Sequence, residues 1–147
     1  MEPIVLQPGE AESFRIGTTS LALLAGADTT DGRLALLQAT LEPDTEGPKA
    51  HLHRTVVDMF FVLEGALTVR LGDDELELPA GSFAAVPPGV VHTFANRSEH
   101  LVRFLNLSVP GGFEKYLREA AALGSEGPPD QELLAKIASR YDFEFVD

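Results

Sequence analysis

Residues 47–65 read GPKAHLHRTVVDMFFVLEG, and residues 81–96 read GSFAAVPPGVVHTFAN. These two segments contain three of the four histidines of the chain, His51, His53 and His92. Side chains two apart in a strand point to the same side, so His51 and His53 project together. His92 follows a Pro-Pro-Gly turn and lies on an apolar strand that should face a core. The pattern indicates a metal site that a small β-barrel assembles from separated strands.

The sequence around these segments alternates short apolar runs with turn-forming residues. The runs predict strands at residues 4–6, 13–16, 21–25, 34–41, 59–63, 66–71, 75–78, 83–86, 90–95 and 101–109. Clusters such as Pro8-Gly9, the loop Asp28–Gly32 and Gly72-Asp73-Asp74 separate them. Strands separated by turn signals every eight to twelve residues or so are typical of an all-β sandwich or barrel.

After Gly112 the apolar residues change to helical spacing. The spacing predicts one helix that begins near Phe113 and is capped by Gly124, and a second that begins after Pro128-Pro129 with Asp130 as its N-cap. We expect both helices to cover the outside of the barrel or a partner subunit. The chain is expected to be a single domain over residues 1–147, with the barrel at about 1–110 and a helical extension at about 111–147.

Two interpretations of the three histidines compete. Buried imidazoles without partners would leave ring nitrogens unsatisfied, at a cost of roughly 1 to 3 kcal/mol each. A shared cation removes that cost, whereas satisfied core histidines are the alternative; the residue types favour the cation. Asp58 can return from the following strand beside His51 and His53. The fourth histidine, His100, lies in a polar loop and is expected to be exposed and incidental.

The spacing of these residues resembles the two motifs of the cupin superfamily. The second motif, G-x5-P-x-G-x2-H-x3-N, is matched at every position by Gly81, Pro87, Gly89, His92 and Asn96. The spacing of the first motif, H-x-H, three or four residues, an acid, six residues and a glycine, is matched by His51, His53, Asp58 and Gly65. The flanking strands and C-terminal helices also resemble the single-domain, quercetinase-like branch of the family.

The resemblance implies a fold, a metal and a set of ligands. The fold is a small antiparallel jelly-roll β-barrel, followed here by two short C-terminal helices, with the metal near the centre of the barrel's mouth. The implied cofactor is one divalent metal ion, iron, manganese, nickel or zinc. Its ligands would be His51, His53 and His92 through nitrogen and Asp58 through its carboxylate.

Two positions depart from the family pattern. The leading glycine of the first motif would fall on Thr45, although Gly47-Pro48 follows just after it. The usual glutamate is replaced by Asp58, which is one methylene shorter. Either the strand that carries Asp58 sits closer to the metal and the carboxylate binds directly, or Asp58 acts through a water molecule as an outer partner.

Apolar residues are expected around this polar centre. Phe60 and Val62 share the face of Asp58, and Phe94 shares the face of His92. Such walls suit a small, partly aromatic or phenolic molecule with one chelating oxygen group, but the same side chains could equally fill the barrel. Gln38 is a candidate polar contact of the pocket only if its face of the strand 34–41 is the inner one, which alternation alone does not settle.

Composition excludes several classes of function. The formal net charge is −12 and the sequence pI is about 4.6, so the protein would repel nucleic acid. There is no cysteine, and therefore no disulfide and no thiolate ligand, so a metal must be bound by nitrogen and oxygen. The N-terminus lacks signal-peptide features and the apolar run Leu21–Ala27 is too short to cross a bilayer. We expect a cytoplasmic protein without a membrane partner.

Two functional classes remain. One is a metal-dependent, dioxygenase-like enzyme that acts on a small oxygenated organic substrate, with Asp58 as the candidate base. Within this class a non-redox isomerase, cyclase or lyase is the alternative, because the fold hosts all of these reactions. The other is a non-catalytic protein that binds a small molecule. A homodimer is expected from the family resemblance, with the N-terminal strands as the elements exchanged.

Overall fold

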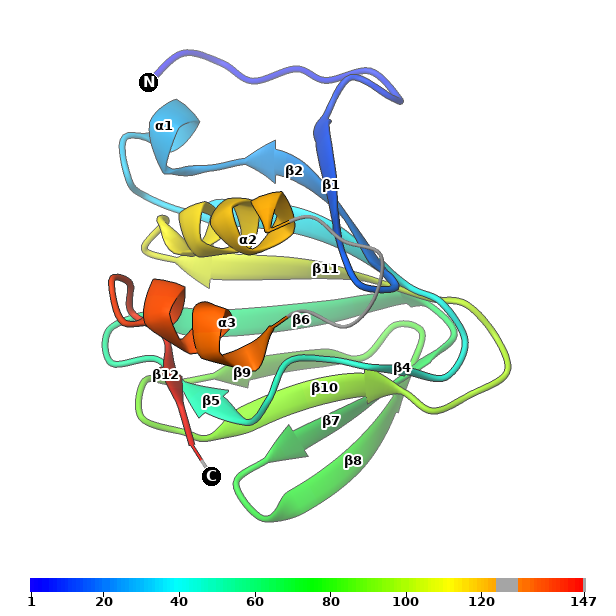
Figure 1. Cartoon of the computed structure of the whole chain (residues 1–147). Helices are drawn as coiled ribbons and strands as arrows, with labels where there is room; N and C mark the ends of the chain where they lie inside the picture. Colours follow the sequence, from blue (N-terminus) through cyan, green and yellow to red (C-terminus); the bar gives the residue numbers. More distant parts are fainter. Residues whose placement is uncertain (124–129, 147) are drawn as a thin grey trace.

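The computed structural model describes residues 1–123 and 130–146, which are organised around two antiparallel β-sheets (Figure 1). The strands of the first sheet run in the order β1 (Glu12–Ile16), β2 (Thr19–Ala25), β3 (Ala35–Leu41), β11 (Val102–Val109), β6 (Val57–Glu64) and β9 (Phe83–Val86). Those of the second run in the order β12 (Glu144–Phe145), β5 (His51–Leu52), β10 (His92–Asn96), β7 (Ala66–Leu71) and β8 (Asp74–Pro79), and β4 (Thr45–Glu46) also pairs with β10. The helices are α1 (Ala27–Thr30), α2 (Phe113–Ala122) and α3 (Gln131–Ala138).

The architecture agrees with the all-β prediction in its main features. Antiparallel sheets are followed by two short helices, and the arrangement is consistent with a jelly roll. Within the described residues the sheets are not closed into a barrel. The end strands are β1 and β9 in the first sheet and β12 and β8 in the second, and no hydrogen-bonded pairing between described strands joins one sheet to the other. An apolar cluster joins α2 and α3 to Ile16 of β1 and Phe145 of β12, so the helices fill the space between those two edges.

Strand alternation builds the core. On β3, Leu37, Ala39 and Leu41 are buried while the residues between them are partly exposed, and on β6 Phe60 and Val62 are buried in the same way. Each fully buried side chain of this size contributes roughly 1.5 to 3 kcal/mol through the hydrophobic effect. The side chains on the inner faces of the two sheets therefore form the hydrophobic core, and Phe60 of this core contacts His92.

Some local predictions differ from the structure. The strand predicted at residues 4–6 is absent, because this segment finds no partner strand and is flanked by Pro3 and Pro8, which lack a backbone N–H. The loop predicted at 28–32 instead begins with the short helix α1. Asp130 does cap α3, accepting hydrogen bonds from two backbone N–H groups. The cap predicted at Gly124 and the Pro128-Pro129 turn lie outside the described residues.

The C-terminal helices occupy a different place from the one predicted. They do not cover the outside of a barrel: Leu117 of α2 packs against the main core, and the ring of Phe113 contacts the ring of His53. Apolar stripes at helical spacing identify a buried face but not the surface that it covers. Over residues 1–123 and 130–146, no helix is long and apolar enough to cross a membrane.

Candidate metal centre

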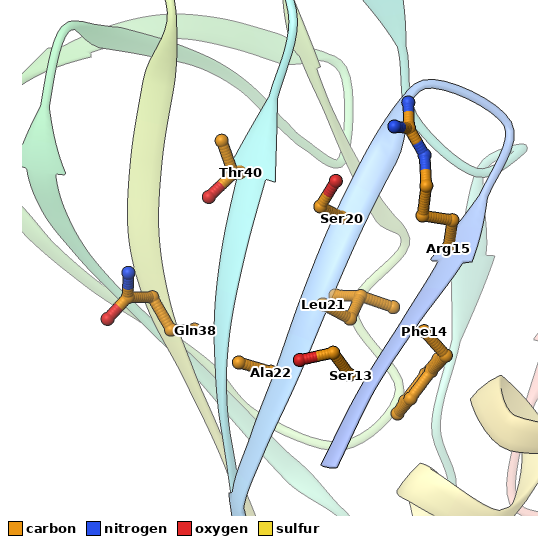
Figure 2. A pocket seen from close by; sticks show the side chains of 8 residues that line it. All are labelled: Ser13, Phe14, Arg15, Ser20, Leu21, Ala22, Gln38 and Thr40. Carbon is orange, nitrogen blue, oxygen red and sulfur yellow. The ribbon is translucent and has the colours of Figure 1, made fainter. Parts of the chain in front are cut away.

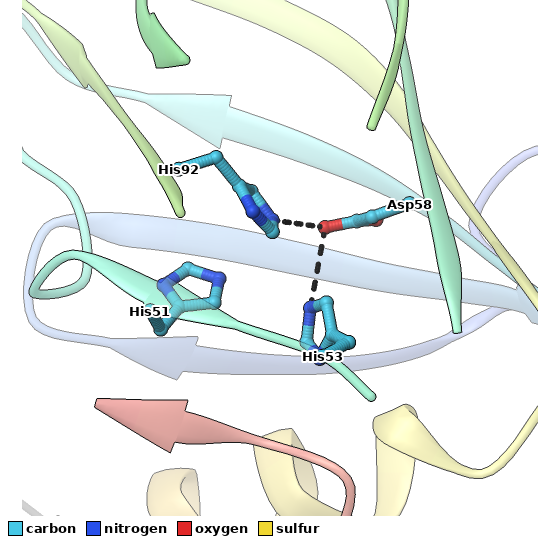
Figure 3. Close-up of side chains that lie close together, drawn as sticks. All are labelled: His51, His53, Asp58 and His92. Atoms are coloured by element: carbon cyan, nitrogen blue, oxygen red, sulfur yellow. Dashed lines mark hydrogen bonds and ion pairs between the residues drawn. The ribbon is translucent and has the colours of Figure 1, made fainter. Parts of the chain in front are cut away.

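Three histidines and one aspartate meet between the two sheets (Figure 3). His51 lies on β5, His53 follows it, Asp58 lies on β6, and His92 begins β10 directly opposite His51. Their side chains come from both sheets. The four residues are only 1% to 3% exposed, and one ligand atom of each lies within 4.8 Å of the others. The structure thus brings together all four residues predicted as metal ligands.

The turn before His92 connects the two motifs. Gly89 has a φ of +85°, a conformation that glycine adopts without strain, and its N–H donates to the main-chain oxygen of His53 at 2.7 Å. Asn96, the last residue of the second motif, donates to main-chain oxygens of residues 41, 42 and 100. The glycine and asparagine of the motif therefore hold the strands in place and do not face the cluster.

The orientation of each imidazole is fixed by the main chain. Each Nδ1 lies within hydrogen-bonding distance of a carbonyl oxygen: His51 of Lys49 at 2.8 Å, His53 of Asp142 at 2.5 Å, and His92 of Val90 at 2.9 Å. A carbonyl oxygen can only accept, so each Nδ1 is the protonated nitrogen that donates. In the neutral rings the lone pairs then lie on Nε2, the nitrogen that His53 and His92 direct toward Asp58.

The Asp58 carboxylate completes the group. Its Oδ2 lies 3.1 Å from Nε2 of His92 and 3.6 Å from Nε2 of His53. Among the described residues, the buried Nε2 of His53 has no hydrogen-bond partner. Lone pairs that face a carboxylate need a proton or a cation between them. Two ligands bound at about 2.1 Å to one ion lie roughly 3.0 to 4.2 Å apart, so the observed spacings fit a shared ion with Asp58 bound directly.

Two further polar residues hold Asp58 in place. Asn106 donates from Nδ2 to Oδ1 of Asp58 at 2.6 Å, and Ser108 Oγ lies 3.4 Å from the same oxygen. Both residues are buried on the inner face of β11. Sequence reasoning missed them, although a signal was present: they are two polar residues at alternate positions in the otherwise apolar segment 104–109.

The cluster shifts the acidities of its members. Burial, together with the neighbouring His92, lowers the pKa of His51 to about 3. Burial lowers the pKa of His53, but Asp58 and the Asp142 carbonyl outweigh this and hold it above its usual value. Burial raises the pKa of Asp58, but His53 and His92 outweigh this and hold it below its usual value. Asp58 is therefore held as a carboxylate, the form in which it can bind a metal ion.

The three residues predicted as apolar walls lie at different distances from the cluster. The ring centroid of Phe60 is 6.3 Å from that of His92, and Phe94 packs on Phe60 at 5.8 Å. Val62 is fully buried in the main core. Phe60 borders the cluster, whereas Val62 and Phe94 mainly fill the interior. Filling of the interior thus describes Val62 and Phe94, and Phe60 is left as a candidate wall residue.

Gln38 does not lie near the cluster, and its predicted place in an inner pocket is wrong. Leu37 and Ala39 take the inner face of β3, which puts Gln38 on the outer face. There it lines a shallow groove over β1, β2 and β3, together with residues such as Ser20 and Thr40 (Figure 2). The more apolar face of the strand turns inward because its burial releases more water.

Two aromatic rings from the C-terminal part of the chain cover the histidines. Phe143 stacks on His51 with centroids 4.4 Å apart, and Phe113 meets His53 edge-on at 5.1 Å. Phe113 and Phe143 also stack on each other. Local sequence patterns do not reveal the contact of Phe143 with His51, because it joins residues more than 90 positions apart.

Sequence comparison agrees with the two-motif pattern. A cupin domain family matches residues 37–109, which include all four members of the cluster. The chain belongs to the cupin superfamily. The chain is 31% identical over 121 residues to quercetin 2,3-dioxygenase of Bacillus subtilis (strain 168). This match places it in the quercetinase-like branch of the cupins. The match covers 79% of this chain but 34% of that enzyme, so this cupin spans about a third of the length of the relative.

Solved cupin structures share the fold. KdgF from Halomonas sp. superposes with a TM-score of 0.66 at 16% identity, covering 78% of this chain and 98% of that one. The polyketide cyclase RemF from Streptomyces resistomycificus superposes with a TM-score of 0.64 at 20% identity, covering 74% of this chain and 80% of that one. At these identities the similarity describes the fold and not the reaction.

Proposed function

We propose that this cupin is a metal-dependent enzyme that acts on a small oxygenated organic substrate in the manner of a dioxygenase. The observation that carries the proposal is the convergence of three imidazoles and one carboxylate in a buried group. Among relatives, the 31% identical quercetin 2,3-dioxygenase supports an oxygen-dependent reaction on a phenolic molecule. The buried cluster and the relative point to the same class of chemistry.

In this proposal His51, His53 and His92 hold one divalent ion through Nε2, and Asp58 holds it through Oδ2. When bound, such an ion polarises a chelated oxygen group and, if it is redox-active, supplies a centre for reaction with dioxygen. The carbonyls that accept from each Nδ1 keep the rings in one orientation. The donation from Asn106 to Oδ1 holds the Asp58 carboxylate in place, with Oδ2 toward the histidines.

The surroundings limit the substrate. Phe60 lies beneath the cluster and Phe113 and Phe143 lie over the histidines, so a molecule at the centre would contact aromatic rings on two sides and polar groups on the third. This arrangement suits a flat, partly apolar molecule with one chelating oxygen group, and it keeps water away. Since the histidines are almost fully buried, the covering rings must move for such a molecule to enter.

The proposal is tested with protein reconstituted separately with iron, manganese, nickel and zinc. Quercetin and simpler phenols are supplied with and without dioxygen, and oxygen uptake and products are measured. We expect oxygen uptake that matches substrate loss with at least one redox-active metal, and none in His92→Ala. Product formed equally without dioxygen would point to an isomerase, cyclase or lyase. Binding without any product, for every metal, would make this cupin a binding protein.

The same proposal includes a homodimer formed through the outer face of the first sheet. Apolar side chains alternate onto that face from three adjacent strands: Met59, Phe61, Leu63, Phe83, Leu105, Leu107 and Val109. Phe61 pairs in register with Leu105 on one side and Phe83 on the other, so the patch is continuous. Phe61 is 41% exposed and Phe83 61%. A large apolar patch is typical of an interface, and two copies related by a twofold axis would cover it.

A further inference from the structure

The C-terminal end of the described chain is attached to the strand that carries the histidines. β12 pairs with β5, so that Glu144 lies opposite Leu52 and Phe145 opposite His51. The N–H of Val146 donates to the main-chain oxygen of Ala50 at 2.8 Å. Residues from the far end of the sequence thus add a strand to the edge from which His51 and His53 project.

Asp142 ties this segment to the loop after His53. One oxygen of its carboxylate accepts from the N–H of Arg54 at 2.5 Å, and the other accepts from the N–H groups of Thr55 and Val56 at 2.8 and 2.9 Å. The hydroxyl of Thr55 donates to it as well. These bonds satisfy three successive backbone donors in the loop that joins His53 to the strand of Asp58. Burial raises the pKa of Asp142, but these hydrogen bonds together outweigh it and hold that pKa below its usual value.

The main chain of Asp142 contacts His53 itself. Its carbonyl oxygen accepts from Nδ1 of His53 at 2.5 Å. His51 and His92 are held by carbonyls only two positions before them, at Lys49 and Val90, within their own segments. His53 differs because its partner lies 89 positions away. The direction of its Nε2 toward Asp58 therefore depends on the placement of the C-terminal segment.

We propose that Asp142 is a positioning residue of the metal centre, which fixes the ring of His53 by locking its own carbonyl against the 54–56 loop. This inference rests on the proposed function, in that the cluster must bind a divalent metal. The carboxylate of Asp142 is engaged by the 54–56 loop, so its role in this inference is to orient His53 and not to bind the metal. Its effect is transmitted through two sets of hydrogen bonds, from the loop to its carboxylate and from His53 to its carbonyl.

The test is Co2+ binding to Asp142→Ala, Asp142→Asn and the control Glu144→Gln. Glu144 is a suitable control because it belongs to the same segment and pairs with Arg54 at 2.8 Å without contacting His53. Loss of a residue that orients a metal-binding histidine typically costs about 10- to 100-fold in metal affinity. We expect that loss in Asp142→Ala, with a changed visible spectrum of bound Co2+. Asp142→Asn, which keeps one acceptor oxygen, should be intermediate, and Glu144→Gln should match the wild type.

A second measurement needs no metal. The Nδ1 proton of His53 should give a slowly exchanging, downfield NMR signal in the wild type and in Glu144→Gln, and a lost or shifted signal in Asp142→Ala. Wild-type Co2+ affinity and spectrum in a folded Asp142→Ala would overturn the inference; if that variant does not fold, the same result in Asp142→Asn would overturn it. A wild type that binds no Co2+ would overturn the proposed function and this inference together.

Discussion

Asp58 is the residue that most sets the character of the site. As the shorter carboxylate it needs a strand close to the histidines, and β6 lies beside β11, whose Asn106 and Ser108 contact the same carboxylate oxygen. The other oxygen is left to face the nitrogens of His53 and His92. One oxygen is thus held by the protein and one is available to a cation. The spacings favour direct binding over action through water.

Asn106 offers a test of this arrangement. Asn106→Leu removes the donor to Oδ1 and leaves the buried carboxylate with one partner fewer, which should weaken metal binding about 10-fold. The matched control is Gln38→Leu, which replaces an amide on the outer face of the neighbouring strand. Titration calorimetry with Zn2+ measures both. Equal affinities in the two variants would show that Asn106 has no role in holding Asp58.

Residue types and spacing were enough to predict the four members of the cluster. Parity in a strand put His51 and His53 on one side, and the second motif placed His92 just after a turn, whose Gly89 contacts His53 in the structure. Gln38 was misplaced because alternation gives two faces and does not say which is inner. The partners of the imidazole Nδ1 atoms are main-chain carbonyls, and no side-chain pattern reveals them.

At the scale of elements, the C-terminal segment was the least predictable part. Strand and helix boundaries follow from local patterns, and β7 and β9 begin and end at the predicted residues. The pairing of β12 with β5 depends on contacts between residues about 90 positions apart, which local patterns do not encode. For the same reason the helices were expected on the outside, whereas Phe113 and Phe143 cover the site.

Phe143 tests whether this segment controls access. Phe143→Ala removes the ring that stacks on His51, so water and a chelator should reach the cluster more easily. We expect EDTA to remove bound Co2+ roughly 10-fold faster than from the wild type, a change of about 1.4 kcal/mol in the barrier. Phe145→Ala is the control, since within the described chain the ring of Phe145 contacts that of Phe143 and no histidine ring. Removal at the wild-type rate from Phe143→Ala would contradict a covering role.

At the scale of the whole molecule, the first sheet is apolar on both faces where β6, β9 and β11 meet. The inner face is the core, and the outer face has no covering element among the described residues. Of the N-terminal strands that were expected to be exchanged in a dimer, residues 4–6 form no strand, whereas β1 is present at the edge of the first sheet. The outer face of the first sheet is a second candidate for an interface between copies.

Sedimentation velocity tests that interface. We expect a dimer for the wild type and a monomer for Phe83→Glu, because a buried, unpaired charge within the patch costs more than the contact contributes. Leu76→Glu is the control, since Leu76 is similarly exposed but lies on β8 of the other sheet. A monomeric wild type, or a dimer that persists in Phe83→Glu, would rule out this face.

The central claim is that His51, His53, Asp58 and His92 bind one divalent metal ion. The most direct test is elemental analysis of protein purified without a metal-chelating tag and reconstituted with each candidate metal. We predict about one ion per chain in the wild type and in His100→Ala, whose histidine is exposed and outside the cluster, and a large loss in His92→Ala. A wild type without stoichiometric metal, or a His92→Ala variant that retains it, would contradict the claim.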